Sequence, residues 1–232
     1  MRIITISGPG KNALGSSLMQ SILDEVKDAG GEPLLLTGDG DAFSAGLNLK
    51  EVYEATPESM RSFHRLLEDL VEALYAYPGP TAAAVNGHAI AGGAILALVC
   101  DHRVATSNPR ARLGLNEVAL GLRFPPRLLA MVTDCIPRRH HNEVLLGAGL
   151  FAPEDALRVG LVDAISDDPT AAATAWLDRT GKHPDGAYAA GKAQLRPPIT
   201  LTDAQQAHFD HVVLPGWLSE SVKQRIAGFF KK

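Results

Sequence analysis

Glu117 is the side chain whose surroundings best suit acid–base chemistry. It stands in the segment LGLNEVALG, among leucines, a valine and glycines. Apolar surroundings raise the pKa of a carboxyl group toward values that are useful for proton transfer near neutral pH. The neighbouring Asn116 can orient that carboxylate or simply cap a turn. A glutamate at the edge of a helix, facing water, is the alternative interpretation of the same pattern.

Two glycine-containing turns are the second chemical feature. FSAGLN (residues 43–48) and AIAGGA (residues 89–94) each follow a predicted strand and precede helix-compatible sequence. The first N–H groups of a helix have no internal partner, so two such turns on neighbouring strands can direct two N–H groups at one oxygen. That arrangement is an oxyanion hole. The spacing alone is equally compatible with two independent tight turns.

A third cluster, Gly8-Pro9-Gly10, follows a strand and precedes a helix, as a dinucleotide-binding fingerprint does. The second strand, however, ends in Thr37-Gly38 rather than in the acidic residue that would bind a ribose. We therefore favour a plain loop with an Asn12 cap over an NAD-linked oxidoreductase.

No metal site is predicted. The adjacent pair His140-His141 would point in different directions on a helix, and no matching cluster of ligands occurs elsewhere in the sequence.

The elements that must position these residues alternate between strands and helices. Apolar, β-branched runs predict strands at 2–7, 33–38, 81–87 and 102–107, and helical spacing predicts helices at 16–31, 57–77 and 91–101. Thr56 and Pro57 are typical of an N-cap and a first helical position. The alternation favours an α/β fold with parallel strands, which by itself suggests a simple open sheet. Beyond about residue 111 the pattern is mostly helical, with a short helix closed by Gly160 and two or three helices after residue 168.

Composition narrows the class of protein. The 232 residues are enough for one large domain, or one domain with a helical appendage, and the net charge of −4 provides no basic surface for nucleic acid or anionic lipid. Two cysteines, Cys100 and Cys135, are too few for a disulfide framework and suit a reducing compartment. No apolar run approaches the roughly 20 residues that span a bilayer. We expect a cytoplasmic protein without a membrane partner.

The motifs, taken in order, resemble those of the crotonase family, the enoyl-CoA hydratase/isomerase superfamily. KNAL, LLLTGDGDAFSAGLNLKE, AAAVNGHAIAGGAILALVCDHRVAT, GLNE and APEDALRVGLVDAI follow one another between residues 4 and 165. The resemblance implies a spiral of repeated β-β-α units over residues 1–166. It also implies a helical region over 167–232 that covers the acyl-CoA site and assembles a homotrimer or a dimer of trimers. Coenzyme A is part of the substrate, and no other cofactor is implied.

The same resemblance assigns roles to the two turns and to Glu117. The backbone N–H groups of Ala45 and Gly92 are expected to form the oxyanion hole for the thioester carbonyl. Hydratases of the family use two glutamates, of which the first position falls on Ile95 and the second on Glu117. With an apolar residue at the first position, efficient hydration is not expected. One glutamate can instead move a proton from C2 to C4 of a 3-enoyl-CoA.

The run NPR…GLNE resembles mitochondrial-type 3,2-enoyl-CoA isomerases in particular, and RFPPRLL replaces the hydratase-type PGxGGTxRL. The residues expected to bind substrate are Ser44, Leu47, Asn48, Lys50, Ile95, Asn116, Phe124, Pro125 and Leu128. Among these, Lys50 is expected to contact a phosphate, and Phe124, Pro125 and Leu128 to line the acyl pocket. Asn48 stands where the family often has aspartate.

Arg123 is an unusual charge beside an acyl site and points to a polar or short acyl group. The C-terminal FFKK is a frayed end or a phosphate-facing tail. The predicted function is 3,2-enoyl-CoA isomerisation in fatty acid oxidation or related acyl-CoA metabolism. The alternatives are a weak hydratase, a thioester hydrolase, a decarboxylase or a non-catalytic acyl-CoA binder.

Overall fold

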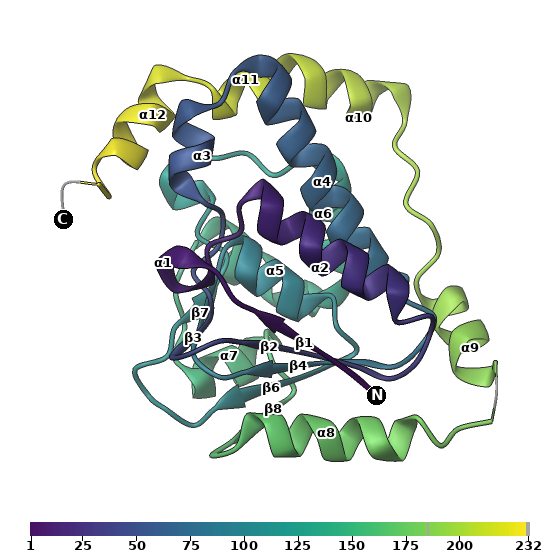
Figure 1. The fold of residues 1–232 in the computed structure, drawn as a ribbon. Coiled ribbons are helices and arrows are strands. Elements are labelled where there is room, and N and C mark those ends of the chain that lie inside the picture. Colours follow the sequence, from purple (N-terminus) through teal and green to yellow (C-terminus); the bar gives the residue numbers. More distant parts are fainter. Residues whose placement is uncertain (185, 231–232) are drawn as a thin grey trace.

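Two parallel β-sheets form the centre of the molecule (Figure 1). The computed structural model describes residues 1–184 and 186–230. The larger sheet has the order β1-β2-β4-β6-β8. Its strands are β1 (Arg2–Ile6), β2 (Leu34–Gly38), β4 (Thr81–Val85), β6 (His102–Thr106) and β8 (Ala164–Ser166). The smaller sheet has the order β3-β5-β7, formed by β3 (Ala42–Ser44), β5 (His88–Ile90) and β7 (Leu113–Gly114).

The chain passes repeatedly from the larger sheet to the smaller one. β2 leads into β3 and then α3 (Leu49–Glu54), and β4 leads into β5 and then α5 (Gly92–Leu98). Gly38 and Gly87 lie at these two crossings, where a Cβ would stand 2.1 Å from the Ala42 carbonyl oxygen and 2.0 Å from the Asp41 carbonyl oxygen. Only glycine permits such close approach. The predicted α/β class and parallel pairings are confirmed, but the simple open sheet is wrong because, from β2 to β8, consecutive strands alternate between the two sheets.

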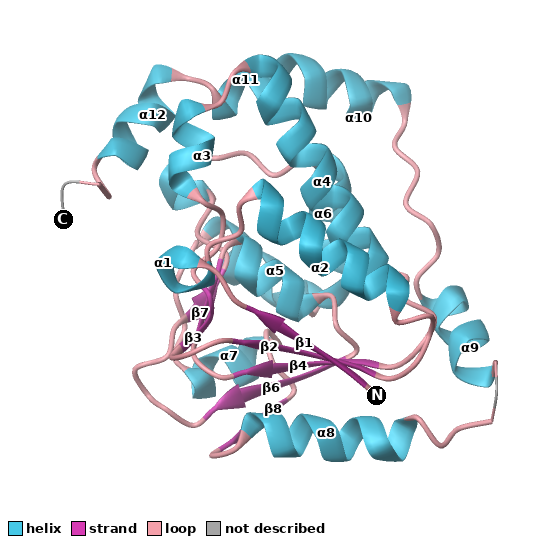
Figure 2. Ribbon diagram, viewed as in Figure 1, coloured by secondary structure: helices cyan, strands magenta, loops and turns pink. Residues whose placement is uncertain are grey.

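Helices cover both faces of the larger sheet (Figure 2). On one face lie α2 (Ser16–Asp28), α4 (Pro57–Tyr75), α5 and α6 (Pro126–Cys135). As predicted, Thr56 caps α4, in a capping box with Ser59. On the other face lies α8 (Pro169–Thr180), whose Ala173 and Leu177 pack against side chains of β2, β4 and β6. Burial on both faces explains the apolar runs of β2 (LLLTG) and β4 (TAAAV), while β6 (HRVAT) buries Val104 and Ala105.

The C-terminal part is more helical than predicted. The helix α7 (Pro153–Val159) ends at Gly160, which has a φ of +81° as a helix C-cap requires. After α8 come α9 (Ala187–Leu195), α10 (Asp203–His208), α11 (Leu214–Trp217) and α12 (Glu220–Ala227), and a π-helical turn, Phe209–Val213, joins α10 to α11. This stretch crosses α4 and brings α12 beside α3 (Figure 1). The predicted boundary between residues 166 and 167 stays a prediction.

The longest helix, α4, is amphipathic, and its apolar side chains are buried. Among the residues that the structure describes, none of the helices combines the length and the apolar character that crossing a membrane requires.

Candidate active site

The carboxyl ends of the three short strands converge on one cavity of about 550 Å³. Parallel strands present their carboxyl ends at the same edge of a sheet, which is where ligands bind in many α/β proteins. The segment after β3 contributes Ala45, Leu47, Asn48, Leu49 and Lys50, β5 contributes Ile90 and Ala91, and the segment after β7 contributes Asn116, Glu117, Leu120 and Leu122. The remaining wall consists of Gly10, Ala13, Leu150, Trp217, Phe229 and Phe230. The smaller sheet therefore gathers both glycine turns and the glutamate around one space.

Glu117 is buried, and its carboxyl group has a raised pKa. Its exposed fraction is 5%, and burial raises the pKa of its carboxyl group to about 7. Its Oε2 atom and the Oδ1 atom of Asn116 are buried without a hydrogen-bond partner in the described part of the chain. The interpretation of Glu117 as a water-facing residue is wrong. An unpartnered buried oxygen is costly unless a ligand satisfies it, so both atoms are available to a substrate.

The amide of Ala45 is not available, contrary to the sequence-based prediction. Its N–H donates to the Lys11 carbonyl at 2.9 Å. On either side of Leu47, the Leu14 N–H donates to the Gly46 carbonyl (2.7 Å), and the Leu14 carbonyl accepts from the Asn48 N–H (3.0 Å). In a parallel pairing this pattern turns the N–H of the intervening Leu47 to the opposite side, where the described residues provide no acceptor. Leu47, rather than Ala45, has the free amide.

Gly92 supplies the other free amide. It is the first residue of α5, and a first-turn N–H has no partner within its helix. The two turns are in contact, since a Cβ at Gly92 would stand 2.9 Å from Leu47 Cδ2 and one at Gly46 would stand 2.7 Å from the Ile90 carbonyl oxygen. The free amides of Leu47 and Gly92 thus belong to neighbouring segments at the cavity edge, and the interpretation as two independent turns is wrong.

Ser44 and Ile95 do not line the cavity. The Ser44 hydroxyl is buried, donates to the Asn12 carbonyl (2.8 Å) and accepts from the Gly46 N–H (3.2 Å). It therefore shapes the first turn. Ile95, with an exposed fraction of 3%, packs in the core from α5. Neither side chain lies in the cavity wall, so their contact with a substrate stays a prediction, and the apolar Ile95 adds no second acid to the site.

The predicted acyl-pocket residues are also displaced from the cavity. Phe124, Pro125 and Leu128 do not line it, and Leu128 lies in the core with an exposed fraction of 1%. The chain turns at Gly121, which has a φ of +74°, and enters α6 at Pro126, from which Leu128 packs in the core. Leu120 and Leu122 line the cavity in their place.

Trp217 is the lining residue that sequence reasoning missed. It comes from α11, about 100 positions after Glu117, and its indole N–H donates to the Arg123 carbonyl at 2.8 Å. The Arg123 guanidinium donates to the Val212 carbonyl at 2.9 Å. Arg123 therefore joins the turn to the C-terminal helices. This hydrogen bond accounts for a charged residue at position 123 without a polar acyl group.

The outer part of the cavity combines an exposed cation with aromatic rings. Asn48 accepts from the N–H groups of Lys50 (3.1 Å) and Glu51 (3.3 Å) and so caps α3. Lys50 is exposed at the rim. Phe230 meets Tyr53 edge to face with ring centroids 5.7 Å apart. The two lysines of FFKK lie outside the described residues.

The Gly8 cluster forms a short helical turn, α1 (Pro9–Asn12), in which Gly10, Lys11 and Asn12 have positive φ, and not the plain loop that the sequence favoured. Asn12 is buried and donates to the carbonyls of Asp39 and Ala42, each at 2.9 Å. Its side chain accepts from the Gly8 N–H and does not cap α2. At the start of α2, the Ser16 N–H donates to the Glu51 carboxylate at 2.9 Å. A carboxylate of this chain thus occupies the place where a dinucleotide would present its pyrophosphate.

A family model described as enoyl-CoA hydratase/isomerase matches residues 1–232. The chain belongs to the enoyl-CoA hydratase/isomerase family. It is 29% identical over 223 residues to the human mitochondrial enoyl-CoA delta isomerase 1, covering 89% of this chain and 72% of the relative. It is also 29% identical over 212 residues to a probable enoyl-CoA hydratase of Mycobacterium avium, covering 89% and 82%.

Solved structures show the same fold. The human mitochondrial delta3-delta2-enoyl-CoA isomerase superposes with a TM-score of 0.86 at 26% identity, over 99% of this chain and 92% of that one. An enoyl-CoA hydratase from Bacillus halodurans gives 0.81 at 23% identity, over 97% and 95%. The crotonase fold inferred from the motifs is confirmed. Because isomerases and hydratases are both among the relatives, similarity alone does not separate the two activities.

Proposed function

We propose that the protein is a 3,2-enoyl-CoA isomerase, which moves the double bond of a 3-enoyl-CoA to the 2-position. One observation carries the proposal: Glu117 is the only acidic side chain among the described residues that line the cavity, and the free amides of Leu47, which lines it, and of Gly92, next to the lining residue Ala91, lie on the two adjoining turns. A lone carboxylate beside an oxyanion hole is sufficient for an allylic proton transfer. It lacks the second carboxylate that positions water in the family's hydratases.

The reaction divides into two proton transfers through one intermediate. The thioester oxygen accepts hydrogen bonds from the N–H groups of Leu47 and Gly92. The Glu117 carboxylate removes a proton from C2, and the C–H electrons move onto the thioester carbonyl to give a dienolate. The protonated carboxyl then returns the proton to C4, and the double bond shifts from C3–C4 to C2–C3. No atom is gained or lost, and coenzyme A, as part of the substrate, is the only cofactor involved.

The physical properties of the site suit both steps. A carboxyl group with a pKa of about 7 has both protonation states accessible at neutral pH, so the same group can serve as base and then as acid. An oxyanion-hole donor is typically worth ~3–4 kcal/mol of barrier. The leucines, Trp217 and the phenylalanines provide an apolar wall for the acyl chain, while Lys50 at the rim provides a cation for a phosphate of coenzyme A. The homotrimer or dimer of trimers remains a prediction.

The test is a comparison of two reactions catalysed by the purified protein. A trans-3-enoyl-CoA is supplied, and formation of the conjugated thioester is followed by ultraviolet absorbance. A trans-2-enoyl-CoA is supplied in parallel, and loss of the same absorbance reports hydration. Fast isomerisation with little hydration supports the proposal. Fast hydration, or binding of acyl-CoA with neither reaction, contradicts it and favours another reaction of the family or a binding protein.

A further inference from the structure

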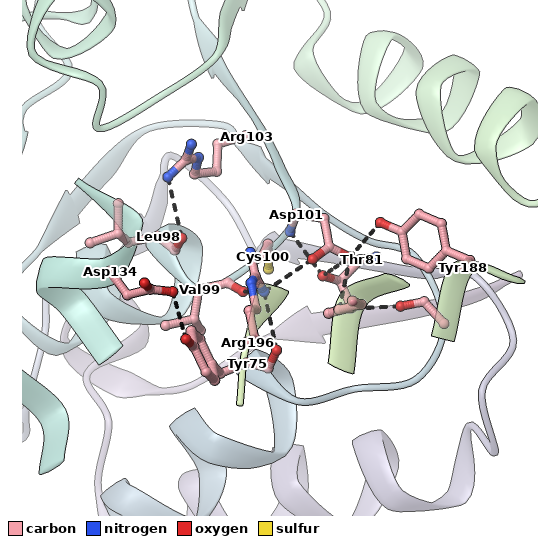
Figure 3. Close-up of polar contacts among 12 residues, drawn as sticks. Tyr75, Thr81, Leu98, Val99, Cys100, Asp101, Arg103, Asp134, Tyr188 and Arg196 are labelled. Atoms are coloured by element: carbon pink, nitrogen blue, oxygen red, sulfur yellow. Dashed lines mark hydrogen bonds and ion pairs between the residues drawn. The ribbon is translucent and has the colours of Figure 1, made fainter. Parts of the chain in front are cut away.

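Two arginines, Arg103 and Arg196, bind the carboxyl end of α5 (Figure 3). This helix, GGAILAL, has no polar side chain, and the last carbonyls of a helix have no partner within it. The Leu98 carbonyl accepts from Arg103 Nη1 at 3.3 Å, and the Val99 carbonyl accepts from Arg196 Nη1 at 2.9 Å. Arg103 follows the helix directly, but Arg196 comes from the segment after α9.

The opposite end of α5 carries the Gly92 amide. The helix is entirely buried and spans seven residues, so a displacement of one end is transmitted to the other. Its N-cap, Ala91, has a φ of +48° and makes no side-chain capping bond. In the described structure, the arginine side chains that hydrogen-bond to α5 do so at its carboxyl end. Cations at this end also complement the helix dipole.

Arg196 is itself fixed by a buried polar cluster. Its Nη1 lies 3.0 Å from Asp101 Oδ1 and donates to the Tyr75 carbonyl at 3.1 Å, and its guanidinium carbon lies 5.0 Å from the centre of the Tyr75 ring. Asp101 also accepts from Lys192 Nζ at 2.8 Å and from the Tyr188 hydroxyl at 2.9 Å. The side chains of Asp101 and Lys192 are 9% and 6% exposed. A buried cluster whose members are mutually bonded fixes one geometry.

We infer that Arg196 is a positioning residue, which holds α5 through the Val99 carbonyl and so fixes the Gly92 amide at the oxyanion hole. The inference rests on the proposed function in one respect, namely that the Gly92 amide acts on the thioester oxygen. Arg196 does not line the active-site cavity. A displacement of about 1 Å in catalytic geometry can cost roughly 10²-fold in rate, so a remote hydrogen bond can affect turnover.

The experiment compares Arg196→Met with Arg196→Lys and with the control Arg158→Met. Arg158 is an exposed arginine that forms ion pairs with Glu143 and Asp155, so its replacement by methionine also removes a cation from carboxylate partners, but away from α5. We expect Arg196→Met to lower kcat about tenfold or more with KM within about twofold of the wild type. Arg196→Lys should be intermediate, because an ammonium keeps the charge but not the planar guanidinium that lies over the Tyr75 ring and reaches the Val99 carbonyl. Arg158→Met should leave both constants unchanged.

Guanidinium rescue separates this role from general destabilisation. Arg196 borders a second cavity of about 340 Å³, whose wall includes Tyr75, Tyr77, Pro197 and Ile199, and through which a guanidinium ion can enter the space left by Arg196→Met. Millimolar guanidinium should restore part of the lost kcat in Arg196→Met and none in Arg196→Lys. A merely destabilised enzyme would lose further activity in guanidinium, and that result would overturn the inference.

Amide hydrogen exchange makes the inference testable even without isomerase activity. Peptides covering residues 92–98 should exchange faster in both Arg196 variants than in the wild type and in Arg158→Met. If the wild type isomerises nothing, the proposed function fails, but the exchange result still decides whether Arg196 fixes α5. If Arg196→Met unfolds throughout, Arg196→Lys decides. Wild-type kcat and wild-type exchange in Arg196→Lys would then overturn the inference.

Discussion

Replacing Glu117 with glutamine is expected to stabilise the protein in alkaline solution while it removes the proposed catalytic base. Burial raises the pKa of Glu117 from 4.5 to about 7, so the folded protein retains a proton that the unfolded chain has already released between these values. The free energy of unfolding of the wild type therefore falls as the pH rises through this window. Above pH 7 both states are ionised, and the folded state carries the full cost of a buried charge. Glutamine is neutral and has no such cost.

The size of the effect follows from the two pKa values. The rise from 4.5 to about 7 lowers the wild-type free energy of unfolding by about 1 kcal/mol at pH 5 and by about 3 kcal/mol at pH 8.5. The stability of Glu117→Gln relative to the wild type should therefore increase by about 2 kcal/mol between these conditions. For a chain of this size, 1 kcal/mol moves Tm by about 2–4 °C, which gives a relative gain of about 4–8 °C.

The assay is urea unfolding of both proteins at pH 5 and pH 8.5, at one protein concentration because self-association would change the apparent stability. Comparing the two conditions removes any constant difference in packing between glutamate and glutamine. A stability difference that does not change with pH would refute the reasoning, since it would mean that Glu117 ionises in the folded protein as it does in water.

Three further predictions concern the surroundings of Glu117. Gly93→Ala places a Cβ 2.5 Å from the Ser44 carbonyl oxygen and should cost about 1–3 kcal/mol of stability in urea unfolding, with a lower kcat, because α5 must move away from β3. Lys50→Met should raise KM for CoA thioesters at low salt without changing kcat, and the difference should shrink in 0.5 M salt if the contact is ionic. Trp217→Phe removes the donor to the Arg123 carbonyl and enlarges the cavity, so it should cost about 1 kcal/mol of stability and shift kcat/KM toward longer acyl chains in a chain-length series.

The fold was predictable to the extent that it depends on long apolar elements. The strands β1, β2, β4 and β6 of the larger sheet and the helices α2, α4 and α5 follow from periodicity and capping residues, whereas β8 was not predicted. The smaller sheet did not follow, because β3, β5 and β7 are only two or three residues long and show no alternation. Those three strands nevertheless bring the active-site residues together, and the sequence indicated their convergence only through a family resemblance.

The site was predictable where the residue type itself carries the chemistry. Glu117 is identifiable because a carboxylate among leucines is unusual. The free amide of Leu47 was not identifiable, because it depends on which neighbouring N–H the Lys11 carbonyl accepts, and every residue in the turn offers the same backbone groups. Trp217 depends on the path of the C-terminal helices, which a tertiary hydrogen bond to the Arg123 carbonyl fixes.

The most direct test of the central claim is the turnover of trans-3-enoyl-CoA by Glu117→Gln, measured beside its affinity for a saturated acyl-CoA. If Glu117 alone moves the proton from C2 to C4, kcat should fall by about 10²–10⁴-fold while the affinity stays within a few-fold of the wild type. A variant that keeps most of its turnover would show that another group moves the proton, and the account of the site would be wrong.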